Sequence, residues 1–269
     1  MKTILLPVDD IEGQEARLQA AFDLARATSG HVDAVQVTPY AAYAVGDGGL
    51  GGFPITSFVE AIAAERQNTR TAIEARLAAE GVSWAWHVFD GDPVDKLAML
   101  SRLADVIVMN SGPFASAASA RLSATGNVAM AAPAPVLIVP PTCRGVDFTG
   151  PALVAWDGSD EAARALRAAL PLLRLASGVT IVTVEEKRPD LGGRDAAIWL
   201  ARHGINAEII ERGDGGNGIE ATLRNVVAET GASLLVQGAY GHSRLRQTIF
   251  GGVTRGLLAD APVPMLIAH

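Results

Sequence analysis

The sequence predicts an α/β protein made of two tandem, doubly wound domains, each built on a five-stranded parallel sheet. Three observations support this prediction. The chain has 269 residues, which is roughly twice the length of a typical domain. Its two halves repeat one another, and in each half short runs rich in Val, Ile and Leu alternate with longer segments of helical periodicity. Such alternation favours a parallel sheet covered by helices on both faces.

The repeat consists of four collinear matches between the halves. Asp9 aligns with Asp157, Val37 with Val184, Ala104 with Ala232, and Pro133 with Pro262. The offset is 148 and 147 residues for the first two pairs and 128 and 129 for the last two, so the fall from 147 to 128 leaves 19 extra residues in the first half. We assign them to an insertion at 39–57. The expected domains are 1–142 and 150–269, joined by a stretch rich in turn-forming residues.

The elements of the second half follow from the apolar runs and the helical periodicity between them. The expected strands are 152–156, 179–184, 205–211, 233–237 and 263–268, and the expected helices are 160–176, 192–203, 218–230 and 252–260. In the first half the clearest helical segments are 12–29 and 57–80. Ligands of such sheets bind beyond the carboxyl ends of the strands, where the strand order reverses. Residues after the first and fourth strands of each half are therefore candidate site residues.

Composition and charge exclude several classes of protein. With 49% apolar and 19% charged residues, the chain is typical of globular proteins. A single cysteine, Cys143, excludes a disulfide framework and favours a reducing compartment, and the five histidines lack metal-binding spacing. The net charge of −7 disfavours broad contact with nucleic acid or anionic membranes. No apolar run is long enough to span a bilayer, and the N-terminus lacks the apolar region of a signal peptide. We therefore expect a cytoplasmic protein.

A glycine motif follows the fourth strand of the second half. Its spacing is G-x2-G-x9-G-G-x-T, formed by Gly238, Gly241, Gly251, Gly252 and Thr254. Glycines allow backbone N–H groups to approach a polyphosphate, and a helix that begins near Gly252 would direct its free amides at the anion. No acidic residue lies between Glu229 and Asp260, whereas His242, Arg244, Arg246 and Arg255 do. The motif therefore predicts an anion site.

The second half, from Asp157-Gly-Ser to this glycine motif, resembles the universal stress protein family, and the whole chain resembles a tandem two-domain member. The resemblance implies an adenine nucleotide alpha hydrolase-like fold with strand order 3-2-1-4-5 in each half. It also implies ATP, with or without Mg²⁺, as the ligand. The implied nucleotide-binding residues are Ala155, Asp157, Val184, Gly238, Gly241, His242, Gly251, Gly252, Val253 and Thr254. Gly252 departs from the usual Ser or Thr, which removes one hydroxyl.

The first half keeps Asp9 and Val37 but loses two glycines of the motif to Asn110 and Leu122. A side chain at these positions blocks close approach to a phosphate, so we expect an empty or repurposed pocket there. The insertion at 39–57 is either a lid or a surface loop. Two structural interpretations also stay open in the second half: the glycines form tight turns only, and Asp157 only caps the helix that follows.

Other readings of the chain are weaker. A second glycine pattern at Gly213, Gly215 and Gly218 is the spacing of a dinucleotide fingerprint, but it follows the third strand of its half instead of the first. The tryptophans are expected to pack in the core, with contact of Trp156 to a base as the alternative.

We expect a non-catalytic sensor or switch; slow ATP hydrolysis or an interaction module without nucleotide are the alternatives. The family resemblance further implies pairing of the two final strands, 136–139 with 264–268, so that the halves form a pseudo-dimer within the chain. A homodimer of chains is expected as well.

Overall fold

The structure is a computed structural model that describes residues 1–9, 13–39, 55–112, 124–185, 191–213, 216–239 and 252–269. The first half contains β1 (Thr3–Pro7), α1 (Gln14–Thr28), β2 (His31–Thr38), α3 (Ile55–Ala79), β3 (Ser83–Asp90), α4 (Pro93–Leu100), η1 (Ser101–Leu103), β4 (Val106–Asn110), α5 (Ala124–Ala131) and β5 (Val136–Val139). The second half contains β6 (Ala152–Ala155), α6 (Asp160–Leu173), β7 (Val179–Glu185), α7 (Gly193–Arg202), β8 (Ala207–Gly213), α8 (Ile219–Thr230), β9 (Leu234–Gly238), α9 (Gly252–Ala259) and β10 (Met265–Ala268).

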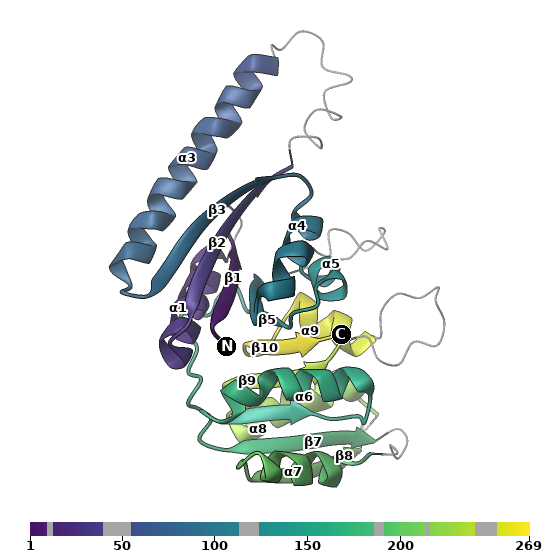
Figure 1. Cartoon of the computed structure of the whole chain (residues 1–269). Helices are drawn as coiled ribbons and strands as arrows, with labels where there is room; N and C mark the ends of the chain where they lie inside the picture. Colours follow the sequence, from purple (N-terminus) through teal and green to yellow (C-terminus); the bar gives the residue numbers. More distant parts are fainter. Residues whose placement is uncertain (10–12, 40–54, 113–123, 186–190, 214–215, 240–251) are drawn as a thin grey trace.

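The strands form one ten-stranded sheet in the order β3-β2-β1-β4-β5-β10-β9-β6-β7-β8. Within each half all pairs are parallel, as the sequence predicted, and the order is 3-2-1-4-5, as the family resemblance implied. The halves meet where β5 pairs antiparallel with β10, with Leu266 opposite Leu137. The expected pairing of the final strands is therefore confirmed, and it joins the two sheets into one (Figure 1).

Helices cover both faces of the sheet, so each half is doubly wound. One core cluster lies under α1, α6 and α7 and includes Phe22, Leu166 and Leu200. The other lies under α4, α5, α8 and α9 and includes Leu97 and Leu257. Each cluster contains residues of both halves, because the sheet continues across the β5–β10 pair. Burial of these apolar side chains is the main source of stability.

Several element boundaries differ from the sequence expectation, most of them by one or two residues. Helix α6 ends at Leu173 instead of at 176. Strand β8 begins at Ala207 and not at 205, because Gly204, with φ of +80°, and Ile205 turn the chain back onto the end of α7, where the Ile205 amide donates to the Leu200 carbonyl. Helix α3 begins at Ile55, so the last residues of the expected insertion at 39–57 are helical, while 40–54 lie outside the described residues.

Helix α3 is the longest described helix of the chain and reaches past the strands at one end (Figure 1). Its carboxyl-terminal part is the anchored part. Ile73 and Leu77 are buried in the core cluster under α1, and Arg76 donates to Glu15 of α1 at 2.9 Å. None of the described helices combines the length and the apolar character that a bilayer-crossing segment requires.

Candidate functional site

The candidate site lies at the carboxyl ends of β6 and β9, the two central strands of the second half. These strands pair in parallel, with Ala155 opposite Gln237. The chain leaves β6 toward β7 on one side and leaves β9 toward β10 on the other. This pair is therefore the point where the strand order reverses, at which open α/β sheets bind ligands. Asp157 follows the end of β6, and Gly238 is the last residue of β9. The structure thus brings together predicted residues of the first and fourth strands.

Asp157 organises the turn between β6 and α6. Its Oδ1 accepts hydrogen bonds from the backbone N–H of Ser159 at 3.0 Å and from the Ser159 hydroxyl at 2.6 Å. Ser159 is the N-cap of α6, since its Oγ accepts from the Ala162 amide at 3.1 Å. Gly158 between them has φ of +76°, which favours glycine. Asp157 therefore orients the cap instead of capping the helix itself, and the carboxylate is held at the exposed edge of the sheet.

Trp156, which precedes Asp157, belongs to the core. It is buried in the cluster under α6 and α7, and its indole N–H donates to the Leu191 carbonyl at 2.9 Å. A buried tryptophan whose N–H has a partner is a packing residue. This agrees with the expectation that Trp156 packs in the core. Its hydrogen bond to Leu191 also connects the residue before Asp157 with the segment before α7.

Gly238 lies where β9 comes closest to the first turn of α6. A Cβ atom at this position would lie 2.5 Å from the Ala162 nitrogen and 2.7 Å from the Glu161 carbonyl carbon. These are backbone atoms, so they cannot move aside as a side chain would. Packing of α6 onto β9 alone thus requires glycine at 238, whether or not a ligand also contacts its backbone.

Three of the predicted residues form an apolar patch on one face of the sheet. Ala155, Val184 and Val253 are half-buried and pack against the core cluster under α8 and α9. They come from β6, β7 and the first turn of α9. A flat apolar group, such as the ring of a base, fits a patch of this kind better than a charged one does.

The helix that follows the glycine motif begins where the sequence predicted. Gly252 is the first residue of α9 and is exposed, and a Cβ atom there would meet none of the described residues within 4 Å. Thr254 is buried where α9 packs on the sheet. Its first-half counterpart Thr125 is also buried and donates to the Asn110 carbonyl at 2.8 Å. The predicted residues Gly241, His242 and Gly251 lie outside the described residues.

Gln237 is a candidate site residue that the sequence analysis missed. It is the next-to-last residue of β9 and is 4% exposed, and in the part of the chain that the structure describes its buried Nε2 atom has no hydrogen-bond partner. Comparison of the two halves contains the signal that identifies it. The aligned residue of the first half is Met109, so a polar side chain replaces an apolar one in the half that has the glycine motif.

The corresponding edge of the first half is filled by its own side chains. Arg17 of α1 is buried and forms an ion pair with Asp9, the counterpart of Asp157. The residue of α6 that aligns with Arg17 is Ala165. Asn110 occupies the position of Gly238 and donates to the Gly13 carbonyl at 3.0 Å. At this edge the first half therefore has the side chains of Arg17 and Asn110 where the second half has Ala165 and Gly238. The first-half residue Leu122 lies outside the described residues.

The rival dinucleotide fingerprint lies away from the strand reversal. Gly213 ends β8, an outer strand of the sheet, and Gly218 is the N-cap of α8 with φ of +84°. Gly215 lies outside the described residues. A turn accounts for the two described glycines, and their position gives the dinucleotide reading no support.

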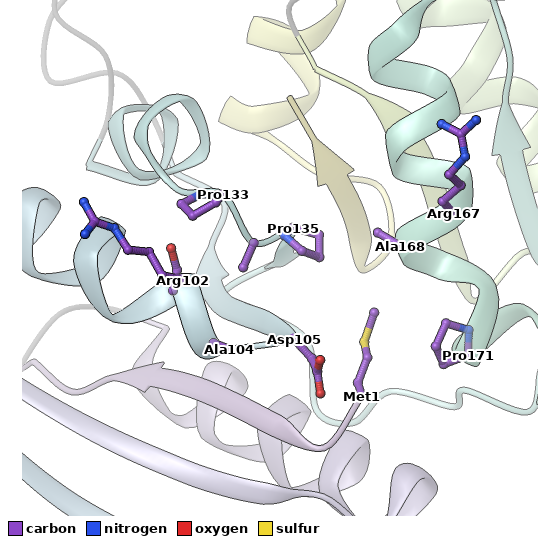
Figure 2. Close-up of a pocket in the computed structure, with 11 residues that line it drawn as sticks. Met1, Arg102, Ala104, Asp105, Pro133, Pro135, Arg167, Ala168 and Pro171 are labelled. Atoms are coloured by element: carbon purple, nitrogen blue, oxygen red, sulfur yellow. The ribbon is translucent and has the colours of Figure 1, made fainter.

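A separate cavity of about 330 Å³ lies between the halves (Figure 2). It is lined by residues before β1, β4 and β5 of the first half and by α6 of the second, including Met1, Asp105, Pro133 and Pro171. Arg102 and Arg167 enter its lining from opposite sides (Figure 2). None of the predicted site residues lines this cavity.

Comparison with known proteins agrees with the two-part architecture. The model of the Universal stress protein family matches residues 1–140 and 150–269. Among solved structures, a universal stress protein from Archaeoglobus fulgidus has a TM-score of 0.75 and 20% identity, over 99% of this chain and 97% of that one. A putative universal stress protein from Pseudomonas aeruginosa has a TM-score of 0.57 and 17% identity, over 100% and 93% of the two chains. A search of curated proteins found no match.

Proposed function

The chain belongs to the universal stress protein family, and from this premise we propose that its second half binds an adenine nucleotide, with ATP as the leading ligand. The bound state acts as a sensor or switch rather than as an enzyme. The observation that carries the proposal is the context of the glycine motif. Strand β9 ends at Gly238 and helix α9 begins at Gly252, so the motif connects a strand at the strand reversal with a helix N-terminus.

The described residues offer a distinct environment for each part of such a nucleotide. The apolar patch of Ala155, Val184 and Val253 suits the base. Asp157, held by Ser159, lies at the same edge and offers a carboxylate to ribose hydroxyls. The first amides of α9 suit the phosphates, because helix N–H groups at this end have no partner within the helix. Gly252 leaves open space beside them. Mg²⁺, where present, would accompany the phosphates.

A binding role fits Asp157 better than a catalytic one. Its Oδ1 already accepts two hydrogen bonds from Ser159, which fix the direction of the carboxylate. A general base needs to take up a proton at the reacting group. We therefore assign Asp157 to positioning of the nucleoside, and we assign no step of ATP hydrolysis to this half.

The first half is proposed to bind no nucleotide. Arg17 neutralises Asp9, and Asn110 occupies the place of Gly238. The intrachain pairing of β5 with β10 then joins a half that binds ligand to one that does not. Changes at the second site have a direct route to the first half through this shared sheet. A homodimer of chains remains a separate prediction, to be tested by the mass of the protein in solution.

The test is equilibrium dialysis of the full chain with labelled ATP, together with mass spectrometry of any ligand released from the purified protein. We expect uptake of about one nucleotide per chain. Asp157→Asn is expected to lower the affinity about tenfold, since it removes a charge-assisted hydrogen-bond acceptor. The matched control Asp9→Asn, at the aligned position of the first half, should leave ATP uptake unchanged.

Three results would contradict the proposal. Absence of uptake, with a melting temperature that saturating ATP does not raise, would favour an interaction module without nucleotide. Timed release of ADP that disappears in Asp157→Ala, while ATP binding is retained, would instead identify a slow ATPase. Equal losses of affinity in Asp157→Asn and Asp9→Asn would show that the nucleotide is not confined to the second half.

A further inference from the structure

Gln237 lies beside the apolar patch of the candidate site. It pairs in register with Ala155 of the neighbouring strand β6. Successive side chains of a strand point to opposite faces, so Gln237 lies on the face of Leu235 and not on that of Val236. Leu235 belongs to the core cluster under α8 and α9, against which the patch of Ala155, Val184 and Val253 also packs. Gln237 and the patch therefore share one face of the sheet.

The amide of Gln237 is an unsatisfied donor. Gln237 is 4% exposed, and its Nε2 atom is buried without a hydrogen-bond partner among the described residues. A buried N–H that has lost its hydrogen bonds to water without gaining others destabilises the folded state. Such a group in a native protein calls for a partner beyond the described residues, and a bound ligand can supply one.

The core itself does not require a polar residue at this place. In the first half the aligned residue is Met109, which is buried in the same apolar cluster. Methionine and glutamine have similar length, and methionine brings no unpaired polar atom. The half that carries the glycine motif has the amide, and the half that has lost the motif has the thioether. The polar side chain is thus present in the half with the candidate ligand site, although the fold common to both halves does not require it.

We propose that the Gln237 amide donates a hydrogen bond to a ring nitrogen of the base, and that Gln237 is therefore a specificity-determining residue of the nucleotide site. This inference rests on the proposed function. The chemistry fits, because glutamine pairs well with the hydrogen-bonding edge of adenine, whose ring nitrogens are acceptors. The apolar surroundings strengthen such a bond, since a site with few polar groups discriminates strongly against a base that leaves the donor unpaired.

The test compares ATP with its 1-deaza, 3-deaza and 7-deaza analogues, each of which lacks one ring acceptor. Affinities are measured by calorimetry for the full chain and for Gln237→Met, which installs the residue of the first half. In the unmodified chain one analogue should bind about tenfold more weakly than ATP, in line with loss of one hydrogen bond in a buried site. Gln237→Met should bind ATP about tenfold more weakly and should not distinguish ATP from that analogue.

Thr183→Val is the matched control. Thr183 is also buried, and its Oγ1 also has no hydrogen-bond partner within the described ranges. Its side chain lies on the opposite face of the sheet, since its hydroxyl oxygen would be 3.1 Å from a Cβ atom placed on Gly193 of α7. Removing this second unsatisfied group should leave the affinity for ATP and for all three analogues unchanged.

The outcomes separate the two proposals. If the unmodified chain binds ATP but Gln237→Met binds it within twofold of the same affinity, or still discriminates among the analogues, the role of Gln237 is wrong and the proposed function stands. If the unmodified chain binds none of the nucleotides, both are wrong. The melting temperature of Gln237→Met without ligand should equal or exceed that of the unmodified chain, because an unpaired buried donor has been removed. A fall in melting temperature would contradict the inference.

Discussion

The side-chain amide of Asn110 donates a hydrogen bond to the backbone carbonyl of Gly13, 3.0 Å away. Asn110 ends β4, and Gly13 precedes α1 with φ of +89°. A Cβ atom on Gly13 would lie 3.0 Å from the Asn110 nitrogen and 2.8 Å from the Pro141 Cβ. The side chain on the strand is therefore accommodated by a glycine at the start of the helix.

The second half solves the same packing problem in the opposite way. The residues aligned with Gly13 and Asn110 are Glu161 and Gly238. Here the side chain, that of Glu161, lies on the helix, and the glycine, Gly238, lies on the strand. A Cβ atom placed on Gly238 would lie 2.7 Å from the Glu161 carbonyl carbon. Close approach of helix and strand needs one glycine at this contact, and the two halves place it on different elements. In the second half this leaves the carboxyl end of β9 without a side chain.

Gly238→Ala is expected to destabilise the protein by about 1–3 kcal/mol, because the added methyl group meets backbone atoms of α6 that cannot rotate away. Urea denaturation measures the change. Gly252→Ala is the control, since a Cβ there meets nothing within 4 Å, and it should change the free energy of unfolding by less than about 0.5 kcal/mol. Equal effects of both substitutions would contradict the packing argument. A larger residue at 238 is unsuited to testing nucleotide contact, because it disrupts packing first.

Much of the fold could be predicted from the sequence because the repeat doubles every signal. Nearly all strands and helices of the second half lie within two residues of the expected ranges. Helix α6 is the clearest exception, since it ends three residues before 176. Nothing in apolar periodicity marks such an end. The start of strand β8 could not be predicted from residue type either. Ile205 is buried and β-branched, as strand residues often are, yet it closes a turn against α7 instead of starting the strand.

Several residues of the candidate site could be predicted from the sequence, but the contacts that these residues make in the fold could not. Glycine spacing identified Gly238 and Gly252, and the aligned Asp residues identified Asp157. The sequence could not show that Gly238 is required by the backbone of Ala162, because that contact joins residues distant in the chain. Nor could it show that Arg17 is buried against Asp9, since a helical arginine is usually exposed. Gln237 escaped notice because a lone polar residue in a strand carries no pattern within its own half, and only its alignment with the apolar Met109 distinguishes it.

Arg17→Met is expected to lower the free energy of unfolding by about 1–3 kcal/mol. The Arg17 side chain is 4% exposed and pairs with Asp9, whose side chain is 37% exposed, so solvent screens part of the interaction that is lost. Methionine keeps most of the apolar stem. A double-mutant cycle with Asp9→Asn, followed by urea denaturation, should give a coupling energy of about 1 kcal/mol. Additive effects would show that the ion pair contributes nothing. ATP affinity should not change in any of these variants.

Asp105 gives the stability of the first half a dependence on acid pH. Partial burial acts to raise the pKa of its carboxyl, but hydrogen bonds from the backbone amides of Lys2 and Thr3 outweigh this effect and hold the pKa below its ordinary value of 3.8. A group whose pKa is lowered on folding contributes stability above its unfolded pKa and loses it as pH falls through the folded value.

The expected measurement compares the unmodified chain with Asp105→Asn by urea denaturation between pH 6 and pH 2. The unmodified chain should be more stable at pH 6, and the difference should shrink below about pH 4, once the carboxyl is protonated in the unfolded state. A difference that stays constant over this range would show that the charge of Asp105 is not what stabilises the start of β1.

Gly252→Ser is expected to strengthen ATP binding about three- to tenfold. A serine at the first residue of α9 adds a hydroxyl donor next to the amides proposed to face the phosphates, and hydrogen bonds to charged groups are the stronger ones. The open space around the Gly252 Cβ position means that the side chain fits without displacing its neighbours. Gly252→Ala separates the hydroxyl from the mere presence of a side chain. Calorimetry should give tighter binding for serine and unchanged binding for alanine. If both variants bind ATP more weakly, the phosphates need the bare backbone at 252, and the family's usual Ser or Thr would be incompatible with the way this chain approaches its ligand.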